Sequence, residues 1–303
     1  MSKIIAVTGA TGKIGKAISE KLLESNVKVR AIARNPENLK LLETKGAEIF
    51  PFNLENTSSL KKIFKGADAV FSMIPPCYHL SNYQEVQKQI AASITEAIQS
   101  AAIQHAVILS SVGADLASGN GHIAPLYTFE TMLKAVPDLS VMVLRSAFFM
   151  ENHLGSIPLI KNTGINGGII NPDCAIGMIS TKDVADIAVE YLQNTIFTEY
   201  NIQYLLGPRD YTFSEATSIL GTAIGKPNLN YVRFSYADFS KGMIQGGFSA
   251  RAADDLFEGL TALGEEQLTK NVYRNAFNTT PTKLEEFARE IFAPAYDSLD
   301  KKL

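Results

Sequence analysis

The chain of 303 residues is 46% hydrophobic and 19% charged, so it can bury one large core, or a core with a smaller lobe. Its net charge of −3, without a block of Lys or Arg, argues against direct binding of nucleic acid or of an anionic membrane. Two distant cysteines, Cys77 and Cys174, suggest neither a disulfide framework nor a metal site, and without a run of membrane-spanning length the cytoplasm is the expected compartment.

The first predicted elements are a strand at residues 4–7, a glycine-rich turn and a helix. A continuous apolar run is typical of a strand buried on both faces of a parallel sheet. Gly9 permits a tight turn, Gly12 lets a pyrophosphate approach bare backbone, and Gly15 lets the helix pack close to the strand. This context predicts a dinucleotide site, whereas an ordinary tight turn is the alternative. The predicted cofactor contacts here are Gly9, Thr11, Gly12, Lys13, Ile14 and Gly15.

The second unit repeats the pattern, with a strand at 27–33, a helix at 36–45 and a strand at 47–52. The residue at the tip of the second strand decides which coenzyme is favoured, because an acid there binds the ribose of NAD and a basic residue accommodates the extra phosphate of NADP. Arg34 occupies this position, so NADP(H) is preferred over NAD(H). The alternative is a solvated surface arginine. Asn53 and Leu54, after the third strand, are predicted to meet the adenine.

A helix is expected at 58–64 and a fourth strand at 68–76, where two prolines end it. The loop at 74–81 would lie at the carboxyl edge of the sheet, so Ile74, Pro75 and Pro76 are predicted cofactor contacts. A helix at 83–101 and a strand at 106–111 follow. Ser110 and Ser111 end that strand and would face the same crevice, although serine at a strand end is also common without any function.

The next predicted elements are a helix at 126–135, a strand at 139–145, a helix beginning near 180–181 and a last strand at 200–206. Phe148 and Phe149 leave the strand toward the crevice, but large apolar side chains such as these are often simply core. Residues 164–172 are rich in Gly and Asn and are predicted to form a flexible excursion. After Pro208 the pattern is mostly helical, with one short strand at 230–234 and a final helix at 282–292.

These elements predict an α/β fold, a Rossmann-type doubly wound parallel sheet with a smaller, mainly helical C-terminal lobe. The expected NADP(H)-binding domain comprises residues 1–153 and 178–207. Residues 154–177 and 208–303 are expected to form a substrate or cap lobe, with the substrate between the two.

Seven stretches have a pattern in common with one known family: residues 7–15, 33–36, 109–114, 144–152, 180–185, 206–208 and 280–287. Together they resemble the NmrA-like family, an atypical branch of the short-chain dehydrogenase/reductase superfamily. The resemblance implies an NADP(H)-dependent reductase of quinones, azo dyes or triphenylmethane dyes, or a redox sensor that binds NADP without turnover. It also implies that Phe148, Phe149 and Asn152 line the nicotinamide end, which makes a site role for the two phenylalanines as credible as a core role.

The sequence departs from the wider superfamily at the position of the proton donor. Members of that superfamily carry Tyr-x-x-x-Lys, in which the lysine lowers the pKa of the tyrosine. Here Tyr127 is followed at the fourth place by Thr131, and Lys134 lies about two helical turns further on. The catalytic residues are therefore unassigned, with Tyr127, Glu130 and Ser111 as candidates. Glu130 could equally be a solvated or structural acid.

Two functions follow from these observations. The first is an NADPH-dependent reductase that passes hydride to a flat, conjugated small molecule, with Tyr78, His122 and Asn152 in the substrate pocket. Each histidine is more often a surface or packing residue than a proton donor. The second is a non-catalytic NADP(H) sensor that acts through protein partners, favoured by the missing Tyr-Lys pair. A homodimer is compatible with either function.

Overall fold

The computed structural model describes residues 2–52 and 57–298, so the predicted adenine contacts Asn53 and Leu54 lie outside the described residues. The chain divides into two compact units. The first unit contains Met1–Ala117, Ile123–Arg145 and Val184–Gln203, and the second contains Ser118–His122, Ser146–Asp183 and Tyr204–Leu303. The roles expected of the two predicted domains, cofactor binding and substrate binding, stay predictions.

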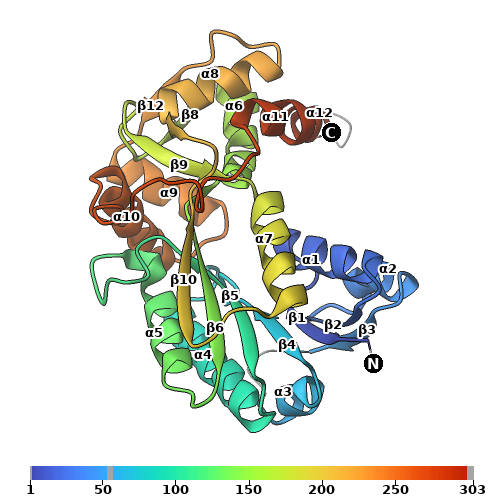
Figure 1. The fold of residues 1–303 in the computed structure, drawn as a ribbon. Helices are drawn as coiled ribbons and strands as arrows, with labels where there is room; N and C mark the ends of the chain where they lie inside the picture. Colours follow the sequence, from blue (N-terminus) through green and yellow to red (C-terminus); the bar gives the residue numbers. More distant parts are fainter. Residues whose placement is uncertain (1, 53–56, 299–303) are drawn as a thin grey trace. The chain divides into compact units, whose positions relative to one another are not determined.

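The first unit is built on a parallel sheet that, within the described residues, has seven strands in the order β10-β6-β5-β4-β1-β2-β3. Strand β1 pairs in parallel with both β2 and β4, so the direction of winding reverses between β1 and β4. In a doubly wound sheet the ligand crevice lies at this reversal, outside the carboxyl ends of the strands. The predicted Rossmann-type fold is confirmed (Figure 1). The strands are β1 (Ile4–Thr8), β2 (Lys28–Ala33), β3 (Glu48–Pro51), β4 (Ala69–Ser72), β5 (His105–Ser111), β6 (Ser140–Ser146) and β10 (Tyr200–Leu205).

Helices cover the sheet because their apolar residues recur on one side. Helices α3, α4 and α5 bury a shared apolar core against the strands, and Ile94 of α4 and Phe129 of α5 are fully buried in it. Helix α1 is joined to α7 by an ion pair between Lys21 and Asp186, with 2.6 Å between the charged atoms. The helices are α1 (Lys13–Glu24), α2 (Lys40–Thr44), α3 (Thr57–Phe64), α4 (Tyr83–Ser100), α5 (Ala124–Lys134) and α7 (Thr181–Asn194).

The second unit is mainly helical but also holds two small sheets. Among the described residues, one sheet has the order β11-β9-β7 and the other pairs β12 with β8. The helix predicted at 282–292 is three consecutive segments, α11 (Leu284–Phe287), a π-helical turn (Ala288–Phe292) and α12 (Ala293–Ser298). The other elements are β7 (Phe148–Phe149), α6 (Ile157–Thr163), β8 (Asn166–Gly168), β9 (Ala175–Ile179), β11 (Asp210–Thr212), α8 (Phe213–Ala223), β12 (Tyr231–Arg233), α9 (Tyr236–Gln245) and α10 (Ala250–Gly264).

The flexible excursion predicted at residues 164–172 is wrong, because part of it is a paired strand. Strand β8 pairs in parallel with β12. A Cβ atom at Gly167 would lie 2.4 Å from the ring of Phe234, and one at Gly168 would lie 2.7 Å from the hydroxyl of Tyr231. The glycines therefore make room for aromatic rings on the neighbouring segment, and their presence here does not indicate flexibility.

Candidate functional site

The glycine turn between β1 and α1 is a tight turn that leads directly into the N-terminus of α1. Gly9 has a φ of +65°, which favours glycine, and its carbonyl accepts a 2.9 Å hydrogen bond from the amide of Gly12. Gly12 is the N-cap of α1 and has no side chain that could cap the first amides of the helix. A Cβ atom at Gly15 would lie 2.3 Å from the Gly9 carbonyl oxygen. The turn thus offers bare amides at a positive helix end, the usual setting for a phosphate.

Two hydroxyl groups, which the sequence interpretation missed, join the ends of β1 and β4 at the reversal point. The side-chain oxygens of Thr8 and Ser72 lie 3.1 Å apart, and both residues are fully buried. The amide of Met73 also donates to the Thr8 hydroxyl, at 3.3 Å. This arrangement holds the two strand ends together beside the glycine turn. The sequence offered little signal for this pair, because Thr8 follows the strand predicted at 4–7 whereas Ser72 lies inside the strand predicted at 68–76, which ends at Ser72 in the structure.

Arg34 lies immediately after β2, and the register that pairs Thr8 with Ile32 places it at the same edge as the glycine turn. Its side chain is exposed, as is that of Lys13 in the turn. Asn35 accepts a 2.9 Å hydrogen bond from the amide of Glu37, which fixes the turn that follows. Two exposed cationic side chains thus lie at the same edge of the sheet as the glycine turn, and cations of this kind can bind phosphate groups.

The loop predicted after β4 is bound to helix α4 by hydrogen bonds. Ile74 is buried, and the carbonyls of Pro75 and Pro76 both accept hydrogen bonds from the side-chain amide of Gln87. Tyr78 is half-buried and meets the fully buried Tyr83 edge-to-face, with ring centroids 5.3 Å apart. The sequence interpretation did not identify Gln87, because a glutamine on the buried face of a helix carries no motif.

Ser110 and Glu130 belong to a buried network between β5, α5, β6 and β10. Glu130 accepts hydrogen bonds from Ser110 at 2.5 Å, from two guanidinium nitrogens of Arg145 at 3.1 and 2.6 Å, and from the Tyr200 hydroxyl at 3.1 Å. Burial, followed by the charge of Glu130, raises the pKa of Tyr200. With these four hydrogen bonds, the buried Glu130 carboxylate links helix α5 to strands β5, β6 and β10.

The second unit contains four of the predicted site residues, His122, Phe148, Phe149 and Asn152. Phe148 is half-buried, and its ring lies 5.6 Å from the rings of His153 and Phe213. Phe149 is half-buried too and pairs with Ile179 in the small sheet, whereas Asn152 is exposed. Phe148 therefore packs at the margin of an apolar core, and the roles of these residues toward a ligand stay predictions.

His122 packs against helix α10 of the same unit. A Cβ atom at Gly259 would lie 2.6 Å from its Nδ1 atom, so a glycine is needed at that point of the helix. Burial lowers the pKa of His122 to about 4, although a backbone hydrogen bond with Asp255 and the charge of that residue act in the opposite direction. In this buried environment His122 has the packing role that is expected of most histidines. A place in a substrate pocket stays a prediction.

The buried His153 is expected to make the stability of the second unit depend on pH. It is 6% exposed among aromatic rings, its Nε2 atom has no hydrogen-bond partner within the described residues, and burial lowers its pKa to about 4. The unfolded chain takes up a proton below pH about 6.5 while the native state resists one, so stability falls as the pH falls from about 6.5 toward 4.

Replacing His153 with phenylalanine is expected to remove about 2 kcal/mol of the stability loss between pH 7 and pH 5. Urea unfolding of the variant and of the wild type at both pH values measures this difference. Part of the dependence should persist, because burial also lowers the pKa of His122. The exposed His79, changed to glutamine, serves as the matched control. An unchanged pH dependence in His153→Phe would contradict the assignment.

A model of the NmrA-like family matches residues 1–288. The chain belongs to the NmrA-like family. A reductase of (4-alkanoyl-5-oxo-2,5-dihydrofuran-3-yl)methyl phosphate from Streptomyces griseus is 28% identical over 74% of the chain and 75% of its own length. An NAD(P)H azoreductase from Xenophilus azovorans is 23% identical over 84% and 85%. The NADPH-bound structure of Escherichia coli quinone oxidoreductase QOR2 superposes with a TM-score of 0.79 at 22% identity, covering 95% and 99% of the two chains.

In this NmrA-like chain the helix that carries Tyr127 has no lysine one turn away. Thr131 occupies that position and donates a 2.8 Å hydrogen bond to the Tyr127 carbonyl. The ammonium group of Lys134 lies 5.5 Å from the centre of the Tyr200 ring, a cation–π contact. The half-buried Ser111 donates to the carbonyl of Val112 at 2.9 Å. The departure from Tyr-x-x-x-Lys therefore has a definite local structure, in which Thr131 bonds to the Tyr127 backbone and Lys134 contacts Tyr200.

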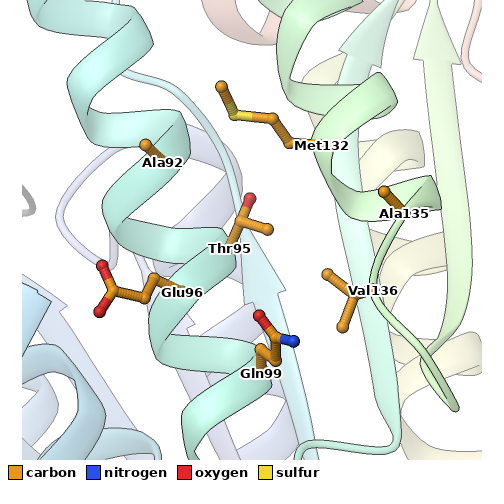
Figure 2. A pocket seen from close by; sticks show the side chains of 7 residues that line it. All are labelled: Ala92, Thr95, Glu96, Gln99, Met132, Ala135 and Val136. Carbon is orange, nitrogen blue, oxygen red and sulfur yellow. The ribbon is translucent and has the colours of Figure 1, made fainter.

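A groove between α4 and α5 of this NmrA-like chain has a volume of about 410 Å³ (Figure 2). Its residues belong to the C-terminal half of α4, to the end of α5 and to the two residues that follow α5, where the chain leads toward the amino ends of the next strands. The groove is thus at the opposite edge of the sheet from the glycine turn. The groove is lined by Ala92, Thr95, Glu96, Gln99, Met132, Ala135 and Val136.

Over residues 2–52 and 57–298, no helix is long and apolar enough to cross a membrane and no cluster of three metal-binding side chains occurs.

Proposed function

We propose that the protein is an NADPH-dependent reductase that passes hydride to an electrophilic, conjugated small molecule such as a quinone or an azo dye. The observation that carries this proposal is the glycine turn at the reversal point of the sheet, where Gly15 approaches the Gly9 carbonyl too closely for any side chain. The names of the relatives, which include a reductase and an azoreductase, support an NAD(P)H-dependent oxidoreductase.

The residues present fit a nicotinamide dinucleotide. The bare amides after Gly9 and the N-terminus of α1 suit the pyrophosphate, and the exposed Arg34 and Lys13 suit the additional phosphate of NADP. When bound, the coenzyme supplies hydride from the C4 atom of its nicotinamide ring. The chain supplies the binding energy and fixes the orientation, and orientation alone can contribute several kcal/mol to catalysis.

A conjugated acceptor suits a site without the Tyr-x-x-x-Lys pair. The negative charge that arrives with hydride spreads through such an acceptor, and water can provide the proton. Tyr127 has Thr131 one turn away, so a lysine is absent from the place where it would lower the pKa of the tyrosine. We assign no proton donor among Tyr127, Glu130 and Ser111.

Turnover is the direct test of the proposed activity. Purified protein is mixed with NADPH and a panel of quinones, azo dyes and triphenylmethane dyes, and absorbance is followed at 340 nm. The proposal predicts acceptor-dependent oxidation of NADPH. Tight binding of NADPH without oxidation across the panel would overturn the reductase and favour the redox sensor.

The preference for NADP(H) over NAD(H) is tested at Arg34. Replacing Arg34 with alanine should weaken NADPH binding roughly 10- to 100-fold, because a charge-assisted contact to phosphate contributes about 1.5–3 kcal/mol. NADH binding should change little. The exposed Lys40, changed to alanine, is the control for a general loss of positive charge. Calorimetric titration gives both affinities, and equal weakening of NADPH and NADH would contradict the phosphate assignment.

A further inference from the structure

Gln87 is a buried polar residue on the mostly apolar buried face of α4. It is 4% exposed on α4, and the buried Ile90, Ala91 and Ile94 follow it on the same helix. Its side-chain Nε2 atom donates to the Pro75 carbonyl at 2.8 Å and to the Pro76 carbonyl at 3.1 Å. Its Oε1 atom is buried without a hydrogen-bond partner in the described part of the chain.

The unpartnered oxygen carries an energetic cost that a leucine at this position would avoid. A buried acceptor without a donor costs about 1–3 kcal/mol. Rotating the amide by half a turn would place Oε1 against the carbonyl oxygens of Pro75 and Pro76, which would repel it. The orientation of the Gln87 amide is therefore fixed by the two loop carbonyls, and its hydrogen-bonding capacity is used to bind the loop.

The loop depends on this side chain because its own backbone offers few alternatives. Proline has no amide hydrogen, so neither Pro75 nor Pro76 can donate a backbone hydrogen bond. The next residue, Cys77, has a φ of +46°, an uncommon conformation for a residue other than glycine. With both carbonyls bonded to Gln87, the two prolines can offer a ligand little besides their hydrocarbon rings.

We propose that Gln87 is a positioning residue for the coenzyme. It withdraws the Pro75 and Pro76 carbonyls onto α4 and so fixes the loop after β4 as a rigid, apolar wall at the carboxyl edge of the sheet. This inference rests on the proposed function, because it requires a nicotinamide coenzyme at that edge. It adds a residue that acts through the loop and does not itself touch the coenzyme.

The test compares NADP⁺ binding by Gln87→Leu, Gln87→Glu and the wild type. Gln87→Leu should weaken NADP⁺ binding about tenfold, which corresponds to one or two lost hydrogen bonds. In turnover, KM for NADPH should rise while kcat at saturating NADPH stays near the wild-type value. The exposed Gln89 on the same helix, changed to leucine, is the matched control and should bind like the wild type.

Gln87→Glu provides a readout that a purely structural role would not change. A protonated carboxyl can donate to a loop carbonyl, whereas a carboxylate can only accept. The binding defect of Gln87→Glu relative to the wild type should therefore shrink as the pH is lowered from 8 to 5, while that of Gln87→Leu stays constant. If Gln87→Leu fails to fold, the pH dependence of Gln87→Glu relative to the wild type decides the question by itself.

Two outcomes would overturn the inference. One is that folded Gln87→Leu binds NADP⁺ within about twofold of the wild type. The other is that the Gln87→Glu defect does not depend on pH. If the wild type itself binds neither NADP⁺ nor NAD⁺, the proposed function fails, and the role of Gln87 fails with it for that separate reason.

Discussion

Replacing Glu130 with alanine is expected to lower the free energy of unfolding by about 3–5 kcal/mol, because it leaves a buried guanidinium without its main partner. Arg145 is 6% exposed, and two of its nitrogens donate to Glu130 at 3.1 and 2.6 Å. The nearest carboxylate oxygen of Asp115 lies 3.6 Å away, so Asp115 compensates only in part. The shift in the midpoint of urea unfolding measures the loss.

A double variant separates the loss of the ion pair from a general packing defect. Changing Glu130 to leucine and Arg145 to methionine together replaces two charges by apolar groups of similar size, and such replacements are often close to neutral. We expect this variant to be more stable than Glu130→Ala. The exposed Thr131, changed to alanine, is the control for the effect of a substitution on helix α5 itself. A loss below about 1 kcal/mol in Glu130→Ala would show that the network contributes little.

Replacing Gly15 with alanine is expected to weaken NADPH binding at least 100-fold, since the turn that should hold the pyrophosphate must move. The new Cβ atom would lie 2.3 Å from the carbonyl oxygen and 2.7 Å from the carbonyl carbon of Gly9. Backbone lies on both sides of this contact, so no flexible side chain can give way. The displacement opens the turn between β1 and α1, and a 100-fold loss corresponds to about 2.7 kcal/mol.

Calorimetric titration of NADPH into Gly15→Ala measures this effect, and circular dichroism checks that the variant is folded. Gly155 is the matched control, because an added Cβ there meets nothing within 4 Å. Gly155→Ala should bind NADPH like the wild type. Wild-type affinity in a folded Gly15→Ala variant would mean that the turn does not hold the coenzyme.

The strands of the first unit could be predicted because most of them contain a short apolar run next to a turn signal. The strand expected at residues 4–7 is Ile4–Thr8 in the structure, and the one expected at 139–145 is Ser140–Ser146. In the second unit, the short strand expected at 230–234 is β12, Tyr231–Arg233, but its partner β8 and the sheet of β11, β9 and β7 were not predicted. The sequence of β8, Asn166–Gly168, is typical of a loop. Its glycines are there because aromatic rings distant in sequence pack against them, and no local pattern indicates this contact.

The candidate site could be predicted only where its chemistry is local. The glycine spacing and the position of Arg34 are readable within one βαβ unit. The environment of Glu130 is not, because its partners Ser110, Arg145 and Tyr200 come from three different strands. Gln87 was missed for the same reason, since its partners precede it across a turn whose conformation no sequence pattern specifies.

Equilibrium titration of the wild-type protein with NADPH and, separately, with NADH tests the central claim most directly. A chain whose first turn holds a nicotinamide dinucleotide should bind one NADPH per molecule saturably, and NADH more weakly. If neither coenzyme binds at millimolar concentration, the reductase, the sensor and the role of Gln87 are all contradicted.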